Sequence, residues 1–155
     1  MASVQNFRDQ IEGAWELISF DVCKENDPTP LAQPLGPKPL GRIMFLPSGY
    51  MSCTLTDPER AKAINSKHWS VASDEEVIFA ARAMTTYCGY FTIYAENDEA
   101  RLSTKVDIAL DPNWIGSTQV RRVGYHEEGG EKFLTLKPVQ YLELPVSEYL
   151  RCKFG

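Results

Sequence analysis

The sequence predicts a mainly β protein, a closed antiparallel barrel of about eight strands with a short helical insertion after the third strand. Stretches of alternating apolar and polar residues recur along the chain and are separated by Gly, Pro, Asn and Asp. This is the pattern of antiparallel strands joined by turns. The chain has 155 residues, of which 43% are apolar and 24% charged. Such a chain forms one domain with a full core, and we expect that domain to cover residues 1–155.

The first elements are a helix and a strand. Apolar residues at helical spacing predict a short amphipathic helix over residues 3–12, with Ser3 as its N-cap. Gly13 ends this helix, and residues 14–23 then alternate as a strand does. Residues 28–39 contain five prolines, which predict an extended loop without a regular element.

A hairpin and two helices are expected next. Residues 40–46 and 50–56 predict two strands, because Pro47-Ser48-Gly49 between them forms a tight turn. Asp57-Pro58 predicts the start of a helix that runs to about Ile64. Ser73-Asp74-Glu75-Glu76 is a capping box that predicts a second helix.

The rest of the chain predicts five further strands connected by turn residues. Their expected ranges are 89–95, 101–109, 118–126, 132–137 and 148–154. With the earlier strands they make eight, and an eight-stranded barrel has an interior just wide enough for side chains or one small ligand.

Charge and targeting signals narrow the partners and the compartment. Sixteen Lys and Arg against 21 Asp and Glu give a net charge of −5, so we expect neither nucleic acid nor an anionic membrane surface as a partner. No apolar run is long enough to span a bilayer, and Met1–Arg8 lacks the apolar region of a signal peptide. We therefore expect a cytoplasmic protein. The sequence is also compatible with a homodimer.

The cysteines and histidines indicate no cofactor or metal site. Cys23, Cys53, Cys88 and Cys152 are far apart, with no CxxC motif, and are expected to be free thiols. The two histidines do not form a ligand motif, and no phosphate-binding glycine loop or dinucleotide fingerprint is present. We therefore expect no metal and no cofactor.

Four segments resemble the lipocalin-like domain proteins of bacteria and fungi. They lie in the family's order and together cover nearly the whole chain. They are Gly13-Ala14-Trp15, Gly41-Arg42-Ile43-Met44-Phe45 with Ser48-Gly49-Tyr50, Tyr87-Cys88-Gly89-Tyr90-Phe91, and Asp111-Pro112-Asn113-Trp114-Ile115-Gly116 with Gln119-Val120-Arg121-Arg122.

The resemblance implies a small calycin-type barrel, often associated with secondary metabolism. Related barrels include carriers of apolar molecules and cofactor-free cyclases, and the fold alone does not decide between them. This sequence departs from the family at Thr104, where a histidine is common. The resemblance also places Gln119 and Arg121 toward the lumen.

Tyrosines suit a lumen that holds an apolar ligand with a few oxygens, because the ring supplies contact area and the hydroxyl one hydrogen bond. Tyr90 and Tyr94 share one face of their strand, and either that face or the opposite one points inward. The expected ligand-binding residues are Trp15, Phe45, Tyr87, Tyr94, Trp114, Gln119 and His68, the last as a residue of a lid between the two helices.

The expected catalytic residues are Arg121, Tyr50, Asp107 and Tyr90. Two interpretations of Arg121 stay open: a cation–π or hydrogen-bond clamp on Trp15 or the barrel end, for which Arg151 is the rival, or an anchor that stabilises charge on a ligand oxygen. Asp107 lies either on a solvated face or inward as a general base, and Asp21 is an inward candidate in the same sense.

These residues predict binding of a small, largely apolar metabolite, polyketide- or terpenoid-like, in the barrel lumen. We expect a cofactor-independent cyclase or isomerase that holds a reactive conformer and moves a proton with Tyr or Asp. The alternative functions are a non-catalytic carrier of the same kind of molecule, and an interaction module whose lumen is filled by its own side chains.

Overall fold

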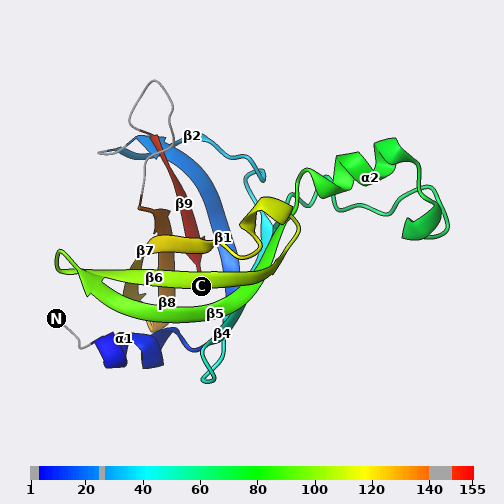
Figure 1. Cartoon of the computed structure of the whole chain (residues 1–155). Helices are drawn as coiled ribbons and strands as arrows, with labels where there is room; N and C mark the ends of the chain where they lie inside the picture. The colour runs from blue at the N-terminus through cyan, green and yellow to red at the C-terminus, as the bar shows by residue number, and fades with distance from the viewer. Residues whose placement is uncertain (1–3, 25–26, 140–147) are drawn as a thin grey trace.

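The computed structural model describes residues 4–24, 27–139 and 148–155, with the side chains of 148–152 left out. Within these residues, eight antiparallel strands close into a barrel through the pairing of β1 with β9 (Figure 1). The strands of the barrel are β1 (Gly13–Lys24), β3 (Leu40–Phe45), β4 (Tyr50–Thr56), β5 (Thr85–Glu96), β6 (Glu99–Ala109), β7 (Thr118–Glu128), β8 (Glu131–Pro138) and β9 (Glu148–Phe154). The predicted antiparallel barrel is therefore confirmed.

The proline-rich segment differs from the expectation of a plain loop. Strand β2 (Asp27–Ala32) pairs with the last three residues of β1, Val22 to Lys24, with irregular register. Proline is tolerated there because β2 is an edge strand, so its missing N–H groups interrupt no second ladder. The first half of β1 pairs with β3 instead, so β1 has neighbours along its whole length.

Helix α1 (Val4–Ile11) lies across one end of the barrel, as Figure 1 shows. The expected N-cap Ser3 lies outside the described residues. Trp15 on β1 is buried, and its indole N–H donates to the carbonyl of Ile11 at 2.8 Å. The Trp15 ring also makes an edge contact with Tyr125 on β7. The G-x-W segment therefore joins the helix to the barrel wall.

Residues 57–84 form an arm that projects away from the barrel (Figure 1). The expected helix over 57–64 is absent, and its place is taken by turns in which Arg60 N–H donates to Asp57 O. A helix this short needs tertiary packing, but none of residues 57–64 is buried, although the Arg60 guanidinium lies over the Phe79 ring, 4.7 Å from its centroid. The 3-10 helix η1 (Trp69–Val71) and α2 (Asp74–Ala81) follow, and the Ser73 capping box is confirmed.

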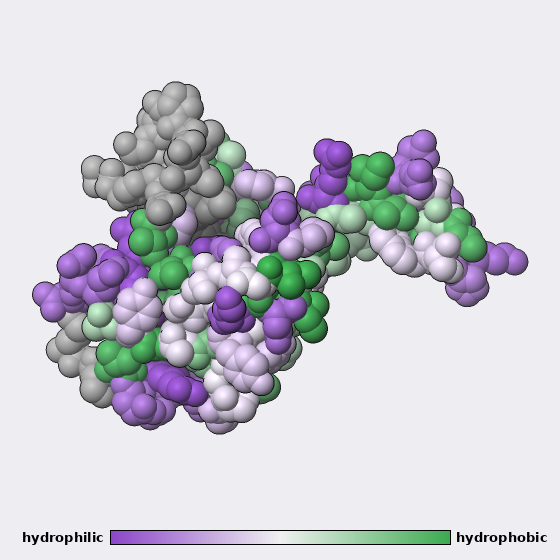
Figure 2. Space-filling view, in the orientation of Figure 1, coloured by the Kyte–Doolittle hydropathy of each residue, from purple (hydrophilic) through white to green (hydrophobic). Residues whose placement is uncertain are grey.

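The large apolar residues of the arm are mostly exposed. Helix α2 buries none of its residues, and Trp69 is 54% and Val71 67% exposed. Figure 2 shows apolar side chains on the surface of this arm, and Ile78 and Phe79 are exposed as well. None of the helices in the described part of the chain is long and apolar enough to cross a membrane.

Side chains from all eight strands fill the middle of the barrel. Phe45 and Phe91 meet edge to face there, with ring centroids 5.1 Å apart. The other buried apolar side chains of this core are Ile11, Trp15, Leu17, Leu35, Ile43, Met51, Cys53, Leu55, Tyr87, Leu102, Val106, Val123, Leu134, Leu136 and Phe154. Any ligand site must therefore lie toward an end or an opening of the barrel.

Candidate functional site

Arg121 lies with other predicted site residues at one end of the barrel interior. Its side chain is half-buried and its guanidinium lies over the Trp114 ring, 5.9 Å from the centroid. Trp114 belongs to the 3-10 helix η2 (Pro112–Trp114), which Asp111 caps by accepting from the Asn113 N–H. The Tyr87 ring meets the Trp114 ring edge to face, with ring centroids 5.2 Å apart. The aromatic partner of Arg121 is thus Trp114 and not Trp15, which leaves a cation–π contact at the barrel end as the form that the structural interpretation takes.

The hydrogen bonds of Arg121 go to uncharged partners. Its guanidinium donates to the Val120 carbonyl at 3.0 Å and, at a long 3.4 Å, to the Gln119 side-chain oxygen. Gln119 in turn donates to the Ser117 hydroxyl. Within the described residues, no carboxylate lies in ion-pair distance of Arg121. A guanidinium carries five N–H donors, so this group has donors left for a ligand oxygen.

The Cys53 thiol lies in the wall beside this group and is not a nucleophile. Its burial raises the pKa of the thiol to about 12, although the Arg121 charge and a hydrogen bond with Tyr87 act to lower it. A thiol with so high a pKa stays protonated at neutral pH. Thr104, at the position where the family commonly has a histidine, is buried in register with Gln119. It offers a hydroxyl but no imidazole.

Tyr50, Tyr90 and Asp107 come together on the outer face of the barrel, away from Arg121. The Tyr50 hydroxyl donates to an Asp107 carboxylate oxygen at 2.8 Å, and the Tyr50 and Tyr90 rings meet edge to face at 5.0 Å. The lumenal placement of Tyr90 and Tyr94 is wrong, because they are 63% and 38% exposed. The alternate residues of β5, Gly89 and Phe91 among them, point inward instead.

Thr104 and Val106 on β6 face the interior, so strand alternation turns Lys105 and Asp107 outward, and β6 carries a bulge at Asp107. Cys88 pairs with Ile108 and Gly89 with Val106, which leaves Asp107 as the additional residue. Asp107 is therefore exposed beside Tyr50 and does not act as an interior base. The carboxylate that does face the interior is Asp21, which is buried and accepts from the Gln33 amide at 3.0 Å.

The Tyr50–Asp107 hydrogen bond predicts a measurable alkaline titration. It is the main cause that raises the pKa of Tyr50 to about 12, from an ordinary 10.0. The raised pKa means that the bond's stabilisation is complete below about pH 10 and is lost as pH rises through 12. We expect Asp107→Asn to bring the pKa of Tyr50 back toward 10 in an absorbance titration of the phenolate. The matched change Asp111→Asn should leave the titration as it was, and an identical shift in both variants would contradict the assignment.

The remaining predicted residues do not lie at the Arg121 end. Phe45 and Trp15 are core residues, the first against Phe91 and the second against α1. His68 is exposed at the N-terminal end of η1 on the arm, which projects away from the barrel mouth (Figure 1). The expected lid position of His68 is therefore wrong in this structure.

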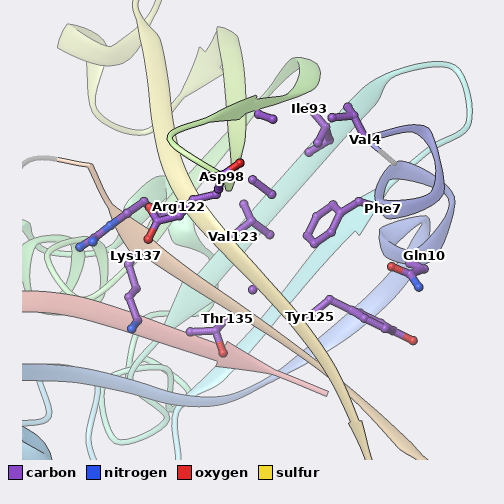
Figure 3. A pocket seen from close by; sticks show the side chains of 14 residues that line it. Val4, Phe7, Gln10, Ile93, Asp98, Arg122, Val123, Tyr125, Thr135 and Lys137 are labelled. Atoms are coloured by element: carbon purple, nitrogen blue, oxygen red, sulfur yellow. The ribbon is translucent and has the colours of Figure 1, made fainter. Parts of the chain in front are cut away.

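A groove at the α1 end was not anticipated from the sequence. It has a volume of about 690 Å3 and lies between α1, the β5–β6 hairpin and strands β7 and β8 (Figure 3). Its lining includes Phe7, Ile93, Val123 and Tyr125, whose apolar character gave the only signal in the sequence. These residues come together because α1 packs beside the strands, and local sequence patterns do not predict that packing. In the described residues, no three His, Cys, Asp or Glu side chains form a group that could hold a metal ion.

These features place the chain in the class of small antiparallel barrels that hold one small molecule or are filled by their own side chains. The chain belongs to the lipocalin-like domain family, whose sequence profile matches residues 12–148.

One relative of known role is the 4'-hydroxy-3'-methoxypropiophenone carrier protein of Aspergillus oryzae (strain ATCC 42149 / RIB 40). It is 40% identical over 55 residues, which are 33% of this chain and 50% of the relative. The chain thus spans about half the length of the curated relative it matches. No solved structure matches the chain significantly.

Proposed function

We propose that this protein binds a small, largely apolar metabolite at the end of the barrel lined by Tyr87, Trp114, Gln119 and Arg121. The observation that carries the proposal is the guanidinium of Arg121, which faces the interior, lies over an aromatic ring and has only uncharged partners among the described residues. A carbonyl, enolate or carboxylate oxygen on the ligand would accept from it.

The aromatic rings suit the apolar part of such a ligand. Tyr87 and Trp114 present ring surface beside the cation, which favours a planar or unsaturated group. The name of the related carrier describes a phenolic aryl ketone, a compound with both an aromatic ring and an acceptor oxygen. We extend to this chain a carrier role of that kind. The proposal further includes that the protein acts in the cytoplasm, that it serves secondary metabolism, and that its ligand is polyketide- or terpenoid-like. The homodimer also stays a proposal.

Cyclase or isomerase activity is the second candidate. Arg121 favours it, because a cation beside a carbonyl would stabilise enolate charge in a transition state. Tyr50, Tyr90 and Asp107 do not support it, since they lie on the outer face and cannot exchange protons with a ligand beside Arg121. Binding without turnover is therefore the better-supported function.

Arg121→Met is expected to weaken binding of 4'-hydroxy-3'-methoxypropiophenone, used as the probe, by roughly 10- to 100-fold. The change removes a charged hydrogen bond, which contributes about 1.5–3 kcal/mol. Isothermal titration calorimetry measures the Kd, and mass spectrometry of the same mixture detects turnover. A product of the same mass with a shifted retention time would favour the isomerase.

The matched control is Arg42→Met, which removes an exposed arginine of β3 that pairs with Glu16 on the surface. It should leave the Kd within about twofold of the unmodified protein. Equal loss of binding in both variants, or none in either, would refute the role of Arg121.

A further inference from the structure

Helix α2 is apolar on every side, yet none of its residues is buried. Val77 to Ala81 are five consecutive apolar positions, so with about 3.6 residues per turn their side chains point in all directions around the helix. A helix that is apolar all round is normally buried. Here Ile78 is 49% and Phe79 54% exposed. An eight-residue helix is also too short to be stable by itself in water, so we expect another surface to cover it.

The arm of residues 57–84 presents α2 already formed and away from the barrel (Figure 1). The Glu76 carboxylate accepts from the Asn65 N–H at 2.7 Å and from the Ser66 hydroxyl at 2.8 Å, in addition to its capping box with Ser73. Because these contacts come from the arm itself, a partner can bind α2 at a small cost in conformational entropy.

Charges flank the centre of α2 in an order that complements itself. Asp74 lies four residues before Ile78 and Arg82 four residues after it, so the three side chains follow one face of the helix. Arg82 has helical backbone angles, so this face continues to it. Asp74 and Arg82 are exposed, and among the described residues neither forms an ion pair. An acid, an apolar residue and a base at equal spacing match a second copy of the same face in the antiparallel direction.

The apolar surface of the arm is large enough for a small dimer interface. Trp69 and Val71 on η1 are exposed beside Ile78 and Phe79, and the four side chains together expose roughly 400 Å2, taking about half the area of a large side chain for each. Two arms therefore offer about 800 Å2, and the charged residues around them bring the total near the ~1,000 Å2 of a small specific interface. We expect a weak, reversible dimer with a Kd on the order of 10 μM.

We infer that α2 is the interface of a homodimer, in which the α2 helices of two copies pack antiparallel about a two-fold axis at Ile78. Each Ile78 then packs on the partner's Ile78, and each Asp74 lies against the partner's Arg82. A second copy supplies the matching charges in the required order, and this favours it over the chain's own barrel end or a different protein. The inference gives an interface to the proposed homodimer and does not rest on ligand binding at the Arg121 end.

Sedimentation equilibrium over protein concentrations from about 1 to 500 μM measures the dimer. Ile78→Glu places two carboxylates against each other on the axis, so we expect it to raise the Kd at least about tenfold. Lys132→Glu is the control, because it reverses an exposed charge on β8 outside the arm, and it should dimerise as the unmodified protein does. Both variants should keep the barrel's melting temperature at low concentration, since the β4–β5 ladder does not involve the arm.

Charge reversal tests the antiparallel arrangement. Asp74→Lys and Arg82→Glu each place like charges at both ends of the interface, so each variant alone should dimerise at least about fivefold more weakly. In an equimolar mixture of the two variants, opposite charges face each other at both ends. The mixture should therefore form heterodimers about as tightly as the unmodified protein forms homodimers.

Three results would overturn the inference. They are a monomer at every concentration, dimerisation of Ile78→Glu as tight as that of Lys132→Glu, and a mixture of the two charge variants that associates no better than either alone. Arg121→Met should dimerise normally, so failure of the dimer and failure of ligand binding give different results.

Discussion

Gly89→Ala is expected to lower the free energy of unfolding by more than about 3 kcal/mol, or to prevent folding altogether. A Cβ at this position would lie 2.0 Å from the Lys105 carbonyl oxygen and 3.0 Å from the Val106 Cα. Both atoms belong to the backbone of β6, beside the bulge at Asp107, so no side chain can move aside. Urea denaturation followed by circular dichroism measures the loss.

Gly124→Ala is the matched control for this prediction. It is also a glycine inside a strand, but its added Cβ has ordinary contact with Thr135 alone. Its free energy of unfolding should stay within about 0.5 kcal/mol of the starting value or rise. If the two alanine variants unfolded at the same urea concentration, the close approach of β5 and β6 at Gly89 would be refuted.

Phe45→Ala should lower the free energy of unfolding by about 3–5 kcal/mol in the absence of any ligand. The side chain is 1% exposed and packs against Phe91 in the filled middle of the barrel. Its loss therefore leaves a cavity. Urea denaturation again gives the value.

Tyr90→Ala is the comparison variant, because it truncates an aromatic side chain on the outer face of the barrel and not in its core. Tyr90 is a second aromatic residue expected at the site, but it contacts Tyr50 at the surface, so we expect a loss of less than about 1 kcal/mol. A small effect of Phe45→Ala, of the size expected for Tyr90→Ala, would show that Phe45 lines an open lumen instead.

Much of the fold could be predicted because its signals are local. Alternation placed the strands, and the capping box of Ser73 placed α2. The five prolines predicted a loop where the structure has β2. Local composition does not reveal that this segment is an edge strand, which tolerates the missing N–H donors of proline. The helix expected after Asp57 failed for the opposite reason. Its cap is present, with the Glu59 N–H donating to the Asp57 side chain, but none of residues 57–64 is buried, and the contact of Arg60 with the Phe79 ring does not suffice to form the helix.

The site was predicted less well because alternation gives two faces and not which of them points inward. The resemblance placed Arg121 and Gln119 inward, and they do lie with Trp114 and Tyr87. The sequence pattern alone could not orient Tyr90. Asp107 lies on the solvated face, one of the two alternatives that the sequence left open, because it alternates with buried Val106. The bulge instead leaves Ile108 exposed beside it, and this bulge depends on a pairing between distant segments and leaves no local signal.

The arm of residues 57–84 leaves the sheet and returns to it at neighbouring points. Leu55 at the end of β4 pairs with Thr85 at the start of β5, so the two strands form a hairpin whose ladder does not involve the arm. The arm is thus a long insertion between two paired strands. It adds an entropic cost of loop closure to folding, and it buries little apolar surface that could offset this cost. Residues of the arm can therefore be substituted with little effect on the stability of the barrel. Selection on their identity then acts through the molecules that the arm contacts, and not through the stability of the fold.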